Sequence, residues 1–269
     1  MGLVSAAMIP GAGASAPKEH AVWTANGGFP AWDRQIGLVF ARDSQVAIAG
    51  GVGWAWTGVG VAPMATGLRG DVRKILRHFD GVRLDGAFAS AYGSQELVDT
   101  VPRFVTAASE DEAAIRIWPS LVLHPQPDGE ARLALICLVE AAIEGLPKFR
   151  WSCELESTAV LPWVGAGGWA DASTLNDAVG EHAHHVLSVI AREIALRRRG
   201  AWVDPVDPSK LVHINMPYWP ADVFWSYFVI GETDQMLYLA QANRGLGHLF
   251  KRRYAWDKRL VAGIQRPSE

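Results

Sequence analysis

The chain has 269 residues, with 25 Lys and Arg against 28 Asp and Glu, so its formal net charge is −3. This balance leaves no excess of positive charge for nucleic-acid binding, and the 49% hydrophobic content excludes a disordered chain. The two cysteines are too few for a zinc framework. We therefore expect a globular protein without a nucleic-acid partner, in which the 27 Gly and 15 Pro favour strands, turns and loops over a helical bundle.

The N-terminal residues 1–16 carry no charge. Their apolar run Leu3–Ile9 is followed by Ala-Ser-Ala at 14–16, which has the form of a signal-peptidase site. Against this interpretation, no basic residue precedes the apolar run, and Pro17 would follow the cut. The alternatives are a small-residue N-terminal arm, or a strand followed by a ligand-binding loop at Gly11–Ser15.

The segment Val46–Leu68 has no charged residue and, as a helix, would be long enough to cross a bilayer. Its many glycines and the two short strands expected before it, Ile36–Ala41 and Gln45–Ala49, favour sheet instead. We expect sheet here and keep membrane insertion as the alternative.

Three helices are predicted from apolar residues at helical spacing. One covers Leu68–Phe79. A second is capped by Ser94 and has apolar positions as far as Val105, with a kink or a break predicted at Pro102. The longest is expected at Ser173–Arg199, with Ser173 as its cap. Its buried stripe would comprise Leu175, Val179, Val186, Ile190 and Ile194.

Three consecutive strands are predicted at Ala113–His124, Arg132–Ile143 and Phe149–Glu156, because turn residues separate them. The third alternates cleanly between apolar and polar positions. Its predicted buried face consists of Phe149, Trp151, Cys153 and Leu155. These strands predict an antiparallel three-strand meander over residues 113–160.

The resulting fold class is α+β, with an antiparallel sheet that carries helices on one face and with a small C-terminal β unit. The predicted C-terminal strands are Val223–Ile230, Met236–Ala242 and Leu246–Lys251. We divide the chain into an N-terminal arm or signal-like segment (1–20), a main domain (21–200) and the C-terminal β unit (201–269).

The two cysteines, Cys137 and Cys153, are placed symmetrically about Gly145 in the predicted hairpin turn. Opposed residues in antiparallel strands are close enough at Cα to form a disulfide. In an oxidising compartment the pair could be a cross-strand disulfide, and otherwise it is two buried thiols. Either role is structural.

The densest group of metal-ligand residues is the Glu-His-Ala-His-His run at 181–185 in the longest predicted helix. Glu181 and His184 have the spacing of carboxylate-bridged metal sites, but the chain lacks the second motif that such sites need. We predict that His184 and His185 face solvent and that His182 flanks the core. We expect no metal and no cofactor.

An aromatic group that includes Tyr218, Trp219 and Trp225 lies close in sequence to Glu232 and Asp234. Aromatic side chains beside carboxylates bind and hydrolyse glycans in other proteins. Here the two acids fall in a predicted hairpin turn, where acidic residues are common. The group is therefore a candidate patch for a ligand or partner.

No motif is specific enough to indicate a family. We expect a non-catalytic, exported protein of a bacterial envelope that works in assembly or binding through sheet edges and Trp-rich loops, with a protein partner or with itself. Its location would be periplasmic or outer-envelope associated, and otherwise cytoplasmic. One alternative is a hydrolase that acts on an ester, glycan or nucleotide through the Gly11–Ser15 loop or the Glu232/Asp234 pair. The other is a membrane-inserting protein in which Val46–Leu68 enters lipid.

Overall fold

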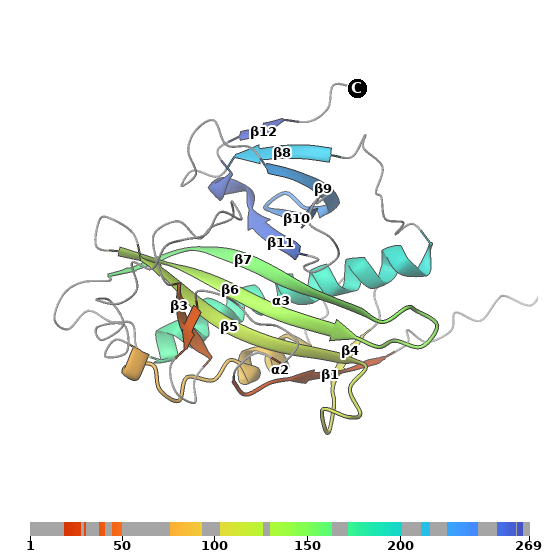
Figure 1. Ribbon diagram of the computed structural model, residues 1–269, viewed down its shortest axis with the longest axis horizontal. Coiled ribbons are helices and arrows are strands. Elements are labelled where there is room, and N and C mark those ends of the chain that lie inside the picture. The colour runs from red at the N-terminus through yellow and green to blue at the C-terminus, as the bar shows by residue number, and fades with distance from the viewer. Residues whose placement is uncertain are drawn as a thin grey trace, which may run out of the picture.

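The computed structural model describes residues 19–27, 30, 38–40, 45–49, 76–92, 103–125, 130–162, 172–200, 211–215, 225–241, 252–261 and 263–265. Within these residues the chain forms one mixed sheet of twelve strands, with a long helix along one face (Figure 1). The strands are β1 (His20–Thr24), β2 (Leu38–Phe40), β3 (Val46–Ala49), β4 (Phe104–Thr106), β5 (Ile115–Pro125), β6 (Glu130–Ala141), β7 (Phe149–Pro162), β8 (Leu211–Asn215), β9 (Trp225–Glu232), β10 (Met236–Gln241), β11 (Arg252–Asp257) and β12 (Gly263–Gln265). The helices are α2 (Asp85–Tyr92), α3 (Ala172–Arg198) and the short 3-10 helix η2 (Lys258–Leu260).

The main path of the sheet runs β12-β8-β9-β10-β11-β7-β6-β5-β1-β4. The outer edge of β5 is shared by two strands, because β1 pairs with its beginning and β3 with its later part, both in parallel. β2 extends the sheet beyond β3. Strands β7 and β11 are also parallel, so the sheet combines antiparallel hairpins with long-range parallel pairs.

The predicted fold class was therefore wrong. The three predicted strands exist as β5, β6 and β7, but they are the middle of a large mixed sheet and not a separate antiparallel meander. The strands β8 to β12 continue the same sheet through the β11–β7 pair, instead of forming a small unit of their own. Turn residues indicate that two strands consecutive in the sequence pair with each other, whereas parallel pairing between distant strands leaves no local signal in the sequence.

The pleat of β7 confirms the predicted alternation. Its four apolar positions, Phe149, Trp151, Cys153 and Leu155, are buried, whereas Arg150 is exposed and both Ser152 and Glu154 are half-buried. The hairpin turn before β7 is centred on Gly145, which has φ 77°, a left-handed conformation that favours glycine. One face of β5–β7 is thereby defined as the core face.

Helix α3 covers this core face, and it matches the predicted Ser173–Arg199 to within one residue at each end. Figure 1 shows it running along β6 and β7. Its stripe of Val179, Val186, Ile190 and Ile194 is at most 1% exposed, as predicted for those positions. Burying each such side chain contributes about 2 kcal/mol, which explains why the helix is fixed to the sheet.

The other predicted helices fared differently. The segment from Leu68 is described only from residue 76, and of its described residues, 76 and 77 are helical. Residues 93–102 lie outside the described part. Val105, predicted to be helical, is in strand β4, and the helix of this region is the earlier α2. The apolar spacing up to Val105 was misleading because strand pairing with β1 overrides helix periodicity there.

Of the segment Val46–Leu68, the structure describes strand β3, and the remainder lies outside the described residues. None of the helices in the described part combines the length and the apolar composition needed to cross a membrane.

Gln45, immediately before β3, ties three distant segments together from a fully buried position. Its side-chain amide donates to the carbonyl oxygens of Ala25 at 2.6 Å and Pro119 at 3.2 Å. Its side-chain oxygen Oε1 accepts from the backbone N–H of Leu84. One side chain thus satisfies buried backbone groups of the sheet and of the loop before α2.

Candidate functional site

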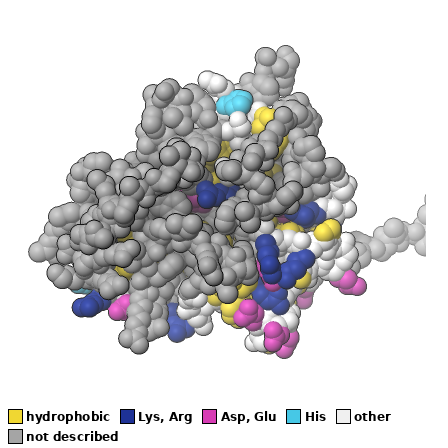
Figure 2. Space-filling view, in the orientation of Figure 1, with side chains coloured by type: hydrophobic (Ala, Val, Ile, Leu, Met, Phe, Trp, Pro, Cys, Tyr) yellow, Lys and Arg dark blue, Asp and Glu magenta, His cyan; other side chains and the backbone are white. Residues whose placement is uncertain are grey.

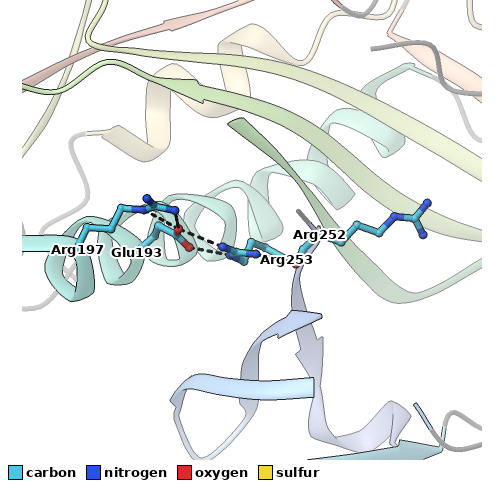
Figure 3. A network of polar contacts seen from close by, with 4 residues as sticks. All are labelled: Glu193, Arg197, Arg252 and Arg253. Atoms are coloured by element: carbon cyan, nitrogen blue, oxygen red, sulfur yellow. Dashed lines mark hydrogen bonds and ion pairs between the residues drawn. The ribbon is translucent and has the colours of Figure 1, made fainter. Parts of the chain in front are cut away.

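A carboxylate on α3, Glu193, lies in the core with no exposed surface. Arg253 of β11 donates to it twice, from Nε to Oε2 at 2.7 Å and from Nη2 to Oε1 at 3.1 Å. Arg197, one helical turn further along α3, donates to Oε1 from Nε at 2.8 Å and from Nη2 at 2.6 Å. Figure 3 shows the carboxylate held between the two guanidinium groups, while Arg252 points away from it.

The two arginines keep Glu193 ionised. Burial on its own raises the pKa of this carboxyl, but the charges and hydrogen bonds of Arg253 and Arg197 outweigh burial and hold the pKa below its usual value. Both guanidinium groups also lie over aromatic rings, Arg197 over Phe149 at 4.5 Å and Arg253 over Trp151 at 6.0 Å. With every oxygen occupied, this network joins α3 to the sheet and has no free base to offer to a substrate.

A second carboxylate, Glu140 of β6, lies on the opposite face of the sheet with its side chain only 7% exposed. It is paired with Arg116 at 3.0 Å, with Lys148 at 3.1 Å and with Arg150. Arg116 and Arg150 stand directly opposite Glu140 on the two neighbouring strands, so the sheet register itself brings the charges together. Burial raises the pKa of Glu140, but the ion pairs with Lys148 and Arg150 outweigh it and lower the pKa.

The surroundings of this second network combine aromatic and acidic groups. Trp23 of β1 stands opposite Arg116 and packs edge-on against Trp118, with ring centroids 6.0 Å apart. Next to them an exposed turn carries three consecutive acids, Glu110 to Glu112. Figure 2 shows basic side chains grouped around acidic ones on this side of the molecule. The face is therefore polar and strongly charged, with both signs in close proximity.

An open cleft of about 470 Å³ lies near the C-terminal end of α3. Arg198 reaches into it and lies 2.9 Å from Nε2 of His20, which accepts a hydrogen bond from the guanidinium and is therefore neutral. The cleft is lined by Glu19, His20, Glu112, Ala113, Ala114, Ala142, Ile143, Glu144 and Arg198. Three of these lining residues, Glu19, Glu112 and Glu144, are acidic.

The histidines of α3 are less exposed than predicted. His184 and His185 are half-buried, with ring centroids 3.7 Å apart, and Nδ1 of His185 is 3.2 Å from the hydroxyl of Tyr238. Burial, followed by the neighbouring His184 and His182, lowers the pKa of His185 to about 3. The predicted solvent orientation of His185 was wrong because the side chain of Tyr238, from β10, lies against its ring. Glu181 belongs to α3, but its side chain is outside the described set.

In the part of the chain that the structure describes, no group of three or more His, Cys, Asp or Glu side chains is arranged to hold a metal ion. Glu181 and His184 therefore remain a sequence-based pair without a described partner set.

The predicted opposition of the two cysteines is confirmed, since Cys137 of β6 pairs in register with Cys153 of β7. Both thiols are free, fully buried and on the core face under α3. Burial raises the pKa of both, so neither is activated as a nucleophile.

The aromatic patch is only partly described. Tyr218 and Trp219 lie outside the described residues, and Trp225 begins β9 but its side chain is not among those described. Glu232 ends β9 and forms an ion pair with Lys258 at 2.7 Å, whereas Asp234 is exposed in the turn that follows. The two acids thus occupy a hairpin, and the loop Gly11–Ser15 of the alternative hydrolase interpretation is outside the described residues.

Sequence reasoning missed both ion networks. Glu193 carried a usable signal, because it follows Ile190 by three residues and so falls on the predicted buried stripe of α3. Its partner Arg253 could not be found in this way, since it comes from a strand whose pairing with β7 is long-range.

Comparison with known proteins finds no match to this chain among protein-family models, curated proteins or solved structures.

Proposed function

We propose that the protein works by binding or assembly and not by catalysis, and that it recruits a protein strand at the β12 edge of its sheet. The observation that carries this proposal is Ile264 in β12, a large hydrophobic side chain that is 37% exposed. It stands out because the other large hydrophobic side chains described are better covered.

The β12 edge has the features of a strand-addition site. In the described part of the chain β12 pairs only with β8, where Ile264 stands opposite Ile214. An edge strand presents unpaired backbone N–H and C=O groups, and an added strand gains affinity from them and specificity from alternate side chains. At the opposite edge of the sheet, β4 has a half-buried Val105 and an exposed Thr106. It therefore lacks an exposed large hydrophobic side chain like Ile264, and we favour β12 as the binding edge.

We also propose that this binding takes place in the bacterial envelope. The basis is the register of Cys137 and Cys153, whose thiols are free in the structure but stand opposite each other on neighbouring strands, as a cross-strand disulfide in an oxidising compartment requires. The test is to count free thiols and determine the intact mass on protein from the native host, after separation of cytosol, periplasm and membrane. A reduced, full-length, cytosolic chain would overturn the envelope location.

The binding proposal is tested with a photo-crosslinking amino acid at Gln265, which is exposed in β12. In the native host we expect a discrete adduct that disappears when Ile264→Lys is added to the same chain. The matched control is Ala89→Lys, which places the same charge at an exposed apolar position on α2. If Ile264→Lys and Ala89→Lys leave the same adduct, the β12 edge is not the binding site.

A further inference from the structure

Two patches of opposite charge form one charged face at the end of the sheet where β5 and β7 begin and β6 ends. The basic patch is formed by Arg116, Lys148 and Arg150 around Glu140. The acidic turn consists of Glu110, Asp111 and Glu112. The two are neighbours, since Nε of Arg116 donates to the backbone oxygen of Glu110 at 2.9 Å.

The basic patch is positively charged and partly open to solvent. Three cations surround one buried acid, while the side chains of Lys148 and Arg150 remain 51% and 46% exposed. Glu140 also fixes their positions, so little side-chain entropy is left to lose when an anionic partner binds. The patch is thus a prearranged, partly exposed cationic surface.

The acidic turn is the opposite case. Its three carboxylates are exposed, and none of them forms an ion pair with another residue of the described part of the chain. Consecutive like charges repel one another and favour a position opposite positive charge. The turn is therefore opposite in sign to the basic patch and carries the same number of charged groups.

We propose that this face binds a second copy of the chain, with the acidic turn of each copy on the basic patch of the other. Two adjacent patches of opposite sign become self-complementary when a twofold axis passes between them, because each contact is then made twice. Half-buried Trp23, opposite Arg116, supplies an aromatic group beside the arginines, a combination that is common at the centre of interfaces.

The test is the oligomeric state of the full chain, measured by sedimentation at low and high salt. Surface ion pairs are weak singly and screened by salt, so we expect a reversible dimer near 50 mM salt that is weakened about tenfold or more near 500 mM. The variant Asp111→Lys/Glu112→Lys and the variant Lys148→Glu should each be monomeric. When the two are mixed, the exchanged charges should restore a dimer that contains one chain of each.

The matched control is Asp80→Lys/Asp234→Lys, which makes the same change in net charge at exposed acids outside this face and should dimerise normally. Circular dichroism checks that Lys148→Glu is folded, and Lys148→Gln, which keeps the size of the side chain, replaces it if it is not. The proposal is overturned if the wild type is a monomer at low salt. It is also overturned if the variant Asp111→Lys/Glu112→Lys still forms a dimer, or if the mixture of the two variants does not. Binding of an acidic peptide without self-association also overturns it.

This inference is independent of the β12 edge. The variant Ile264→Lys should keep the salt-sensitive dimer even where it abolishes strand addition, and the turn variant should keep the adduct at Gln265.

Discussion

Glu193 of α3 and Arg253 of β11 are 60 positions apart in the chain and are joined by two hydrogen bonds, at side-chain exposures of 0% and 3%. This pair, completed by Arg197, connects the long helix to the strand that links the two halves of the sheet. It is a charge network in a place where apolar packing would be expected, so its removal should be costly.

We expect Glu193→Gln to destabilise the protein by about 3 kcal/mol or more, because two buried guanidinium groups would lose their counter-charge. Chemical unfolding in urea measures this loss. The control is Glu154→Gln on β7, a half-buried position that should cost well under that amount. A loss below about 1 kcal/mol for Glu193→Gln would mean that solvent, and not the arginines, satisfies the carboxylate.

Stability should fall as the pH drops from neutral toward 5, in part because of His185. Its pKa is lowered to about 3 in the folded protein, so between that value and 6.5 the unfolded chain binds a proton that the folded chain does not. The unfolded state is therefore favoured in this window. After allowance for the solvent that reaches the half-buried ring, the effect at pH 5 is about 1 kcal/mol.

The measurement is urea unfolding at pH 7 and pH 5 for the wild type and for His185→Gln. The variant should lose less stability between the two pH values, since glutamine does not titrate. Equal losses in both proteins would show that His185 does not carry the effect.

The two thiols should be inert in the folded, reduced protein. Cys137 and Cys153 are fully buried with raised pKa values, so a thiol reagent meets neither an accessible sulfur nor a thiolate. We expect no fast-reacting thiol under native conditions and reaction of both after denaturation. Rapid labelling of either cysteine in the native state would contradict the packing of the core face.

Replacing Gln45 by Leu should destabilise the protein by about 3 kcal/mol, because buried backbone groups of Ala25, Pro119 and Leu84 would lose their hydrogen-bond partner. Thermal unfolding compares this variant with Gln235→Leu, which alters an exposed turn position. Similar melting temperatures for the two would show that water reaches the site and replaces the side chain.

Local patterns in the sequence were sufficient for the elements that pair with their neighbours. The turn at Gly145 predicted the hairpin and, from it, the register of Cys137 with Cys153, because a symmetric turn determines which residues stand opposite. The apolar period predicted α3 nearly to the residue. These features depend on interactions between residues close in the chain.

The rest depends on contacts that sequence periodicity does not encode. Nothing local indicates that β1 and β3 share one edge of β5, or that β11 lies beside β7. The candidate surfaces were missed for the same reason, since Arg116, Glu140 and Arg150 come from three strands and meet only through register. A charged residue in an apolar stripe, as at Glu193, was the one clue available.

The parallel pairing of β7 with β11 also has a consequence for synthesis of the chain. Arg252 must reach Ser152 before the centre of the sheet can close, so the ribosome exposes β5–β7 and α3 well before their last neighbour exists. During that interval β7 is an open, apolar-faced edge, and closing so long a loop is slow. Until its C-terminal strands emerge, the nascent chain is therefore prone to aggregation through this open edge.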